Sequence, residues 1–433
     1  MLHSDRYYSD GHPITLLVRG AVLCYVAIVL LLHLAAVAQY LNSISSSAAL
    51  ARMSIYAGFL GPFSVFLGVL LWDTVRNGGV RIMRIFSSVG LILGPLALIT
   101  ILALAFNFHP TAYWGEHGDS RLLPFFPLFS FLYGCFGASF VVISGVVRHY
   151  RGIFILCIVF LFFSQLLDFL SLDALTQYEG RAAGFASNPN FSAQLLLALT
   201  IASVDWRRAS LLNNLIWLVA GVGVFLTLSR GGLLEYVLAL CVYLVVTTRA
   251  QARTLLSQLV LVAILILTLV FGLPLLTPFL ESNEMMTSPT AQKKLEQLNA
   301  LLTGNLESVA SDDRAWVAYE WVDRITQSPW LGHGTGFVST TLGPHNIYLN
   351  QWVENGVLGL ALLLVFIFAS FWHFKRYKDF RGVMYVATWC VAGFFSHNLL
   401  QPQPFLFLWG FLGALAYVER RRPNPPHPSL PRA

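Results

Sequence analysis

A succession of long apolar stretches is the feature that most limits what this 433-residue chain can fold into. A helix needs about 20 mostly apolar residues to cross the hydrocarbon core of a membrane. Runs that meet or approach this length cover residues 14–40, 53–74, 82–106, 122–147, 152–170, 190–204, 209–228, 231–248, 254–277, 346–373, 382–398 and 404–418. The pattern predicts an all-α polytopic membrane protein with about twelve transmembrane helices.

The composition excludes the common alternatives. Hydrophobic residues make up 56% of the chain and charged residues 11%, whereas soluble chains have about 45–50% and about 25%. This balance rules out a soluble enzyme and a disordered chain. A nucleic-acid module is excluded because 27 basic residues spread over 433 form no basic face. Every cysteine lies in an apolar run, which argues against both a disulfide framework and a cysteine-ligated metal.

The distribution of Lys and Arg predicts the orientation of the chain. Twelve spans place both termini on one side, and with a cytoplasmic N-terminus 19 of the 27 basic residues fall in cytoplasmic segments and 8 outside. This asymmetry favours cytoplasmic N and C termini. The first span is too long for a signal-peptide core, so we expect no cleavage.

The chain therefore divides into four parts. Residues 1–277 hold spans one to nine, residues 278–345 form one large external loop, residues 346–418 hold spans ten to twelve, and residues 419–433 form a basic, Pro-rich cytoplasmic tail. Two helices are predicted in the loop, over 288–303 and 312–327, from a Ser-Pro start, an apolar stripe and a stop before Pro329. One face of the second helix carries Arg314, Ala318, Trp321 and Ile325.

Arg230 is the first candidate functional residue. The sequence Ser229-Arg230-Gly231-Gly232 joins spans seven and eight with almost no loop. A charge this close to the apolar core is costly and needs a partner. Two interpretations stay open: an anionic ligand, or an ion pair with Glu235.

A second candidate is the segment from Arg181 to Asn190, which precedes span six on the external side. Its Asn188-Pro189-Asn190 sequence predicts a turn and a helix start, with Asn190 as the candidate N-cap. Its small residues permit close approach of a ligand to the backbone. The alternative is a simple helix-start turn with a surface arginine.

Two further features concern catalysis and metals. His345 stands at the start of span ten, where the helix dipole favours a neutral imidazole, so it is a candidate general base or an ordinary interface histidine. Asp312 and Asp313 are adjacent and diverge by about 100° on a helix, which disfavours chelation of one ion. We therefore predict neither a metal nor a cofactor. The glycine-rich stretch 330–336 is predicted to be a flexible turn, not a phosphate loop.

Together these motifs resemble one family. The order is Arg181-x-x-Gly184-x-x-x-Asn188-Pro189-Asn190, then Ser229-Arg230-Gly231-Gly232, then an external loop with Arg314, Pro-Trp-Leu-Gly-x-Gly-x-Gly, and His345-Asn346-x-x-Leu349…Glu354-x-Gly356-x-x-Gly359. This pattern resembles the O-antigen ligase/polymerase superfamily, over residues 181–359. The resemblance implies a multi-spanning membrane glycosyltransferase in the bacterial inner membrane, with its active site facing the periplasm.

The resemblance also implies substrates and roles. The donor would be a glycan on undecaprenyl pyrophosphate, and the acceptor of a ligase would be the lipid A–core oligosaccharide. His345, Arg230 and Arg314 are then expected to be catalytic, with Arg181, Asn188 and Asn190 binding substrate and no metal required. A direct displacement would invert the anomeric configuration.

Two alternatives remain. A polymerase would join lipid-linked repeat units, although the single external loop with His345 at the start of span ten favours a ligase. A twelve-span secondary transporter would have a similar layout, but transporters place polar sites near mid-membrane in both halves of the chain. Here the notable polar groups gather on the external side of the second half.

Overall fold

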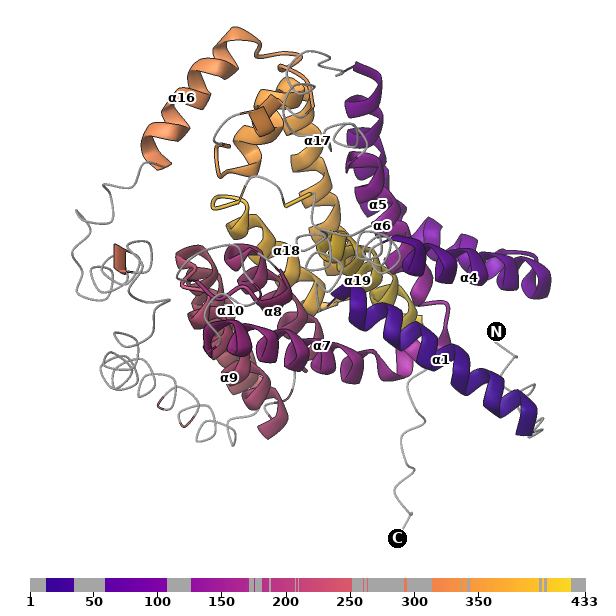
Figure 1. Ribbon diagram of the computed structural model, residues 1–433. Helices are drawn as coiled ribbons and strands as arrows, with labels where there is room; N and C mark the ends of the chain where they lie inside the picture. The colour runs from indigo at the N-terminus through magenta and orange to yellow at the C-terminus, as the bar shows by residue number, and fades with distance from the viewer. Residues whose placement is uncertain are drawn as a thin grey trace.

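The computed structural model describes residues 13–34, 59–106, 126–170, 175, 181–186, 188–206, 208, 210–250, 260, 263, 292–293, 314–335, 337–340, 343–396, 399–400 and 403–421. Helices account for most of these residues (Figure 1). In chain order they are α1 (Pro13–Leu34), α4 (Gly61–Asn77), α5 (Val80–Phe106), α6 (Phe126–Phe140), α7 (Ser144–Leu170), η4 (Gly184–Ala186), α8 (Pro189–Ser203), α9 (Leu211–Leu226), α10 (Arg230–Ala250), α16 (Arg314–Gln327), η6 (Phe337–Thr340), α17 (Ile347–Tyr377), α18 (Phe380–Ala392) and α19 (Gln403–Arg421).

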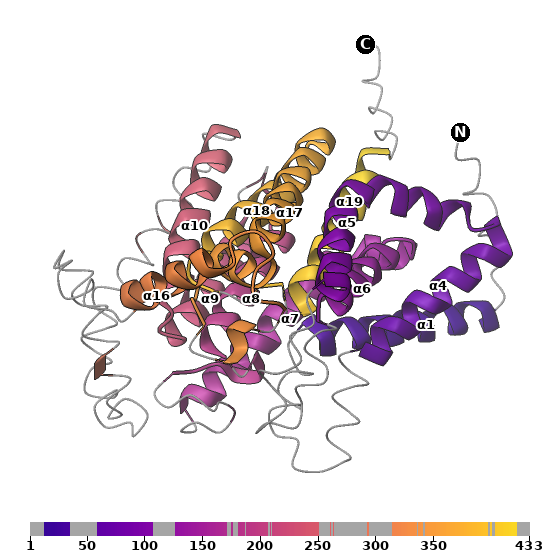
Figure 2. The ribbon, with the colours of Figure 1, turned by 90° about the horizontal axis from the view of Figure 1, so that it is seen from above.

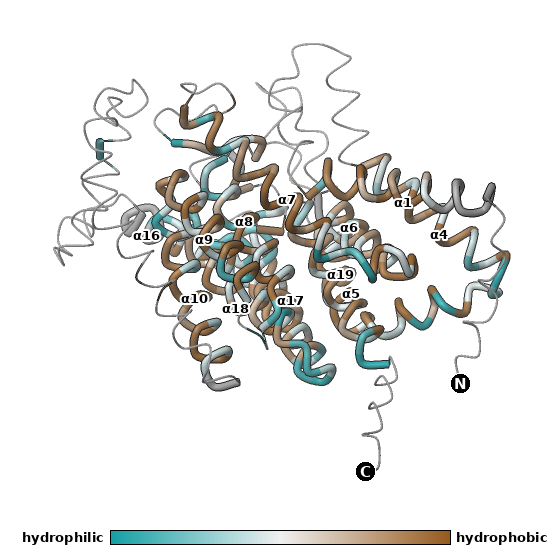
Figure 3. Tube along the Cα trace, turned by 90° about the horizontal axis from the view of Figure 1, so that it is seen from below, coloured by the Kyte–Doolittle hydropathy of each residue, from teal (hydrophilic) through white to brown (hydrophobic). Residues whose placement is uncertain are grey.

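The helices coincide with the predicted apolar runs, apart from the run 254–277, which lies almost wholly outside the described residues. Four helical stretches are long and apolar enough to cross a membrane: Val80–Leu104, Ser144–Leu170, Arg230–Thr248 and Ile347–Tyr377. Figure 3 shows the apolar character along α10 and α17. The helical class is thus confirmed for the described residues, and the number of spans and their sidedness remain predictions.

Of the two helices predicted in the external loop, the second is confirmed as α16. The first lies outside the described residues, apart from 292–293. Figures 1 and 2 both place α8, α9, α10, α17 and α18 on one side of the molecule and α1 and α4 on the other. Helices α5, α6 and α19 lie between these groups.

Glycines allow α6 and α19 to pack closely against each other in the centre of the molecule. A Cβ added at Gly137 would overlap the carbonyl oxygen of Phe407, and one added at Gly410 would overlap that of Gly134. Because apolar side chains gain little by leaving lipid for a helix interface, van der Waals packing between small residues is what holds such helices together. The two backbones therefore approach each other directly.

Polar contacts gather at two opposite ends of the bundle. The "Arg381 end" contains residues 150, 205–206, 208, 210–213, 379–381 and 419. The "pocket end" contains residues 168, 181–186, 188–190, 227–231, 345–347, 393–396 and 399–400. Successive helices alternate between them: α8 starts at the pocket end, α9 starts at the Arg381 end, and α10 starts again at the pocket end. The predicted cytoplasmic residues lie at the first end and the predicted external residues at the second.

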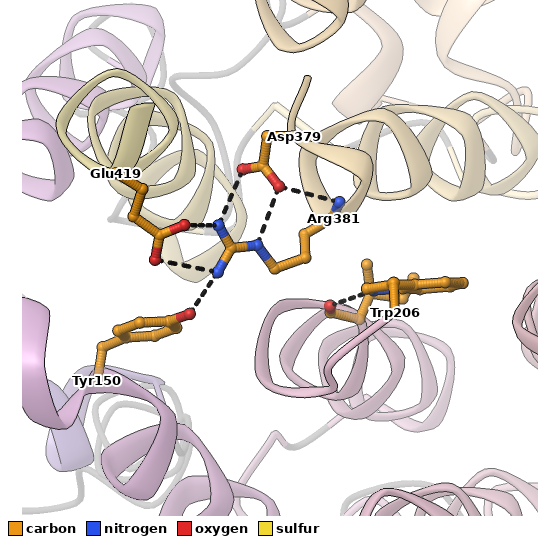
Figure 4. A network of polar contacts seen from close by, with 6 residues as sticks. Tyr150, Trp206, Asp379, Arg381 and Glu419 are labelled. Atoms are coloured by element: carbon orange, nitrogen blue, oxygen red, sulfur yellow. Dashed lines mark hydrogen bonds and ion pairs between the residues drawn. The ribbon is translucent and has the colours of Figure 1, made fainter. Parts of the chain in front are cut away.

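A buried ion-pair network joins three helices at the Arg381 end (Figure 4). Arg381 Nε lies 2.9 Å from Asp379 Oδ1, and its Nη2 lies 2.5 Å from Glu419 Oε2 on α19. Its Nη1 also donates to the hydroxyl of Tyr150 on α7. Since the Arg381 side chain is only 14% exposed, its two carboxylate partners offset the cost of burying its charge.

We expect Gly137→Ala to lower the thermal stability of the detergent-solubilised protein, because the added methyl group would force α6 and α19 apart. Overpacking of this kind costs about 1–3 kcal/mol. The matched control is Gly90→Ala on α5, where an added Cβ meets nothing within 4 Å. Equal unfolding temperatures for the two variants would contradict the assigned contact.

Candidate functional site

A buried carboxylate organises the segment that carries Arg181. Asp168, near the end of α7, is fully buried. Its Oδ2 accepts hydrogen bonds from the amides of Ala183 (2.8 Å) and Gly184 (3.0 Å), and its Oδ1 accepts one from Leu175 (3.0 Å). Charge-assisted bonds to backbone amides are stronger than neutral ones. Asp168 therefore fixes the backbone that follows Arg181.

The start of α8 corrects one detail of the prediction. The N-cap is Asn188, not Asn190: Asn188 Oδ1 accepts from the amides of Asn190 (2.9 Å) and Phe191 (3.3 Å). Pro189 explains the register, because proline is favoured as the first residue of a helix and the cap then directly precedes it. The side chain of Asn190 is thereby left for contacts outside its own helix end.

Asn190 connects the two arginine motifs. Its Oδ1 accepts from Arg181 Nη2 at 2.8 Å and from the Ser229 hydroxyl at 2.9 Å. Arg181 also donates from Nε to the carbonyl oxygen of Thr227 at 3.0 Å. The segment before α8 and the α9–α10 junction, which are far apart in the sequence, therefore form one polar network.

The α9–α10 junction is sharply bent. Leu228 adopts a left-handed conformation with φ of 48°, which is uncommon for a bulky residue. Ser229 then accepts from the amide of Gly232 at 3.2 Å and so caps α10. This bend places Arg230 in the first turn of α10, where the helix dipole adds to the attraction for anions.

These elements surround one pocket, lined by Arg181, Asn190, Gln194, Leu228, Ser229, Arg230, Gly231 and Phe395. Two guanidinium-bearing residues thus line the same recess with neutral hydrogen-bonding groups. The ion pair considered between Arg230 and Glu235 does not occur among the described residues. Instead, the buried Glu235 accepts a hydrogen bond from Gln194 at 3.4 Å. The arrangement suits an anionic ligand with hydroxyl groups.

His345 lies at the pocket end, two residues before the start of α17 and beside the residues that follow α18. Its φ of 49° is left-handed, and Asn346 after it caps α17 by accepting from the amides of Tyr348 (2.9 Å) and Leu349 (3.1 Å). The amide of Ile347 donates to the carbonyl of Gly393 at 2.8 Å. Gly393 stands two residues before Phe395, which lines the pocket. His345 itself is not among the residues that line the pocket, so its part in the site stays a prediction.

The glycine-rich stretch, predicted to be a flexible turn, is hydrogen-bonded to α17. The amides of His333 and Gly334 donate to the carbonyls of Val353 (2.7 Å) and Glu354 (2.9 Å), and the amide of Val357 donates to Pro329 (2.9 Å). These bonds form where α17 is kinked at Gly356, which has φ of 65°. A Cβ at Gly356 would overlap the backbone of Trp330, so both glycine-rich motifs serve this contact.

Arg314 is the first residue of α16, which agrees with its predicted place near the start of that helix. The buried Trp321 and Ile325 of α16 pack with Val338 and Val353, which confirms the predicted apolar face at those two positions. The structure does not describe the Arg314 side chain, so its approach to the pocket stays a prediction. Asp312 and Asp313 lie outside the described residues.

Sequence reasoning missed Gln194 and Phe395. Gln194 follows Asn190 by one helical turn, so the spacing offered a signal for it. Phe395 reaches the pocket only through the packing of α18, and no local pattern indicates that. The described residues form no cluster of three or more His, Cys, Asp or Glu suited to a metal, and the prediction of a metal-free site remains a prediction.

Comparison with known proteins agrees with the motif order. Residues 215–364, from within α9 to within α17, match the sequence model of the family described as O-antigen ligase. This match supports membership of the O-antigen ligase/polymerase superfamily. No curated protein matches it. Membership implies a membrane protein of glycosyltransferase type that acts on lipid-linked glycans in general.

The matched O-antigen ligase region contains three of the predicted site residues, Arg230, Arg314 and His345. The pocket also draws on Arg181 and Asn190, which lie upstream of the match. The site is therefore assembled from the matched region and the preceding helices.

We expect Asp168→Asn to loosen the Arg181 segment selectively. The amide has one accepting oxygen in place of two, so at least one buried backbone amide loses its partner, at a cost of about 1–3 kcal/mol. Hydrogen–deuterium exchange should become faster over residues 181–186.

Asp73→Asn provides the matched control, because Asp73 is another buried aspartate that accepts a backbone amide, from Ile82 at 2.8 Å, at the opposite end of the bundle. It should accelerate exchange around residue 82 and leave 181–186 unchanged. Unaltered exchange over 181–186 in Asp168→Asn would show that the carboxylate does not hold this segment.

Proposed function

We propose that this protein is an O-antigen ligase, which transfers a glycan from undecaprenyl pyrophosphate to the lipid A–core oligosaccharide on the periplasmic face of the bacterial inner membrane. The observation that supports this most is the pocket lined by both Arg181 and Arg230, at the starts of α8 and α10. Pyrophosphate is the anionic part of such a donor, and arginine binds phosphate oxygens through paired N–H groups.

The manner in which Arg181 is held supports an anionic ligand. Among its contacts, the hydrogen bonds to Thr227 and Asn190 go to neutral oxygen atoms. Neutral acceptors orient a guanidinium group without cancelling its charge, in contrast to the carboxylates around Arg381. Asn188 supports the site indirectly, as the cap that sets the start of α8.

The reaction breaks the bond between the anomeric carbon and the pyrophosphate oxygen and forms a bond from that carbon to an acceptor hydroxyl oxygen. The electron pair of the broken bond leaves with the pyrophosphate, where Arg230 and Arg314 stabilise the growing charge and Arg181 provides a third contact. Donors aimed at developing charge in a dry site contribute about 3–4 kcal/mol each. Attack from the opposite face inverts the anomeric configuration.

The proton of the acceptor hydroxyl passes to His345 in this proposal. A neutral imidazole at the start of α17 is suited to act as general base or to orient the hydroxyl. Its left-handed backbone conformation is of the kind that concentrates at functional sites. No metal takes part in the proposed steps.

A lipopolysaccharide gel tests the function in the cell. Deletion of a ligase leaves bare lipid A–core while lipid-linked polymer accumulates, whereas deletion of a polymerase leaves core that bears one repeat unit. We expect bare core, rescued by the wild-type chain and by Arg324→Lys on the exposed face of α16, but not by Arg230→Lys. Lysine keeps the charge and loses the paired N–H groups, so transfer should fall about 10²-fold or more. Rescue by Arg230→Lys at the wild-type level would exclude paired binding of pyrophosphate.

We expect His345→Ala to abolish most transfer by the purified, reconstituted protein while donor binding is retained, because the base acts only after the donor is bound. Loss of general base catalysis typically costs about 10²–10⁴-fold in rate. His333→Ala is the matched histidine control, since His333 contacts the carbonyl of Arg324 and the ring of Phe337, away from the pocket. A folded His345→Ala protein with full activity would remove His345 from the mechanism.

A further inference from the structure

The turn between α16 and α17 exposes two large apolar side chains. Trp330 is 73% exposed and Leu331 is 68% exposed. The backbone around them is held firmly, because the carbonyl of Pro329 and the amides of His333 and Gly334 are all bonded to α17. The chain thus holds Trp330 and Leu331 outward, although burial of these side chains in an apolar environment would be favourable.

The length of α17 indicates where the turn at Trp330 and Leu331 lies relative to the membrane. From Val357, just after the kink, to Tyr377, where the helix ends, are 21 residues. At about 1.5 Å per residue they span about 31 Å. This length matches the thickness of a membrane's hydrocarbon core, which is about 30 Å. Lys375 and Arg376 mark the far end. The kink, and the turn bonded to it, therefore lie at the membrane surface on the pocket side.

The exposed face of α17 supports the same placement. Leu358, Val365, Phe368 and Trp372 follow one another at helical spacing and are 49%, 50%, 70% and 63% exposed. This stripe ends in Trp372 near the basic residues and is continued at its other end by Trp330. Tryptophan is enriched at both surfaces of a membrane, so Trp330 and Trp372 bracket the stripe as interfacial residues do.

The neighbouring helix α16 does not offer its apolar face to lipid. Trp321 and Ile325 are only 4% and 5% exposed, because they pack inside the protein. Its outward positions Glu320, Asp323 and Gln327 are exposed and polar. Val322 of α16 is 48% exposed, less than Trp330 and Leu331, so among the described residues of this segment the turn at 330–331 exposes more apolar surface than the helix.

We propose that the Trp330–Leu331 turn is an interfacial anchor that inserts into the phospholipid leaflet on the pocket side. Its ligand is the boundary between head groups and acyl chains. Since the turn continues directly from α16, the anchor would hold the end of that helix at the level where a lipid-linked pyrophosphate lies. The anchor itself requires only a membrane, and its test does not depend on glycan transfer.

Spin labelling measures the depth of the turn in the full chain. The accessible or partly accessible cysteines Cys24, Cys241 and Cys390 are first replaced by alanine. Leu331→Cys is then labelled with a nitroxide and reconstituted into vesicles of phosphatidylethanolamine and phosphatidylglycerol. We expect collisions with oxygen to exceed those with a water-soluble nickel complex, as they do for lipid-buried labels.

Two reference sites calibrate the result. Phe368→Cys reports the lipid-exposed middle of α17, and Gln327→Cys reports the polar surface two residues before Pro329. The ratio of oxygen to nickel collisions at Leu331→Cys should fall between the two reference values and closer to that of Phe368→Cys. Trp330→Cys gives a second measurement of the turn if Leu331→Cys is poorly folded. Labels at 330 and 331 that match the aqueous Gln327 reference would overturn the proposal.

Discussion

The cost of leaving a backbone amide or carbonyl without a partner governs this structure. Within apolar surroundings each such group costs several kcal/mol, so helices satisfy most of them internally and any break must be compensated. The breaks at the pocket end are compensated one by one. Asp168 accepts the amides of the Arg181 segment, Asn188 caps α8, and the kink at Gly356 is bonded to residues 329–334. The functional groups stand at these breaks because an unbroken helix wall could not present them.

The two ends of the bundle treat arginine in opposite ways. Arg381 is surrounded by Asp379 and Glu419, and its role is to join α7, α18 and α19. Arg181 donates instead to the carbonyl of Thr227 and the amide oxygen of Asn190. The first arrangement uses the charge within the protein, whereas the second orients a charge toward a ligand.

Hydropathy was sufficient to predict most of the helices, because the length of an apolar run is a local property of the sequence. The motif order also brought Arg181, Asn190 and Arg230 into consideration, and the structure places these residues around one pocket. The Asn-Pro-Asn pattern alone does not tell which asparagine caps α8. Asn188 is the cap because Pro189 takes the first helical position. The contact between Gly356 and Trp330 joins segments 26 residues apart, and Phe395 reaches the pocket from the turn that follows α18. Such contacts depend on tertiary packing, which no local pattern encodes.

A lipid-linked substrate also constrains where these breaks occur. The pyrophosphate of the proposed donor is attached to a polyprenyl chain that stays in the hydrocarbon core, so its charge would reside near the membrane surface and not at mid-membrane. The helix starts at Pro189, Arg230 and Ile347 and the kink at Gly356 all lie at one end of the bundle. A transporter would instead break its helices near the midplane, where a substrate must be reachable from both sides. The position of the breaks is therefore itself an argument for a surface reaction with a membrane-anchored donor.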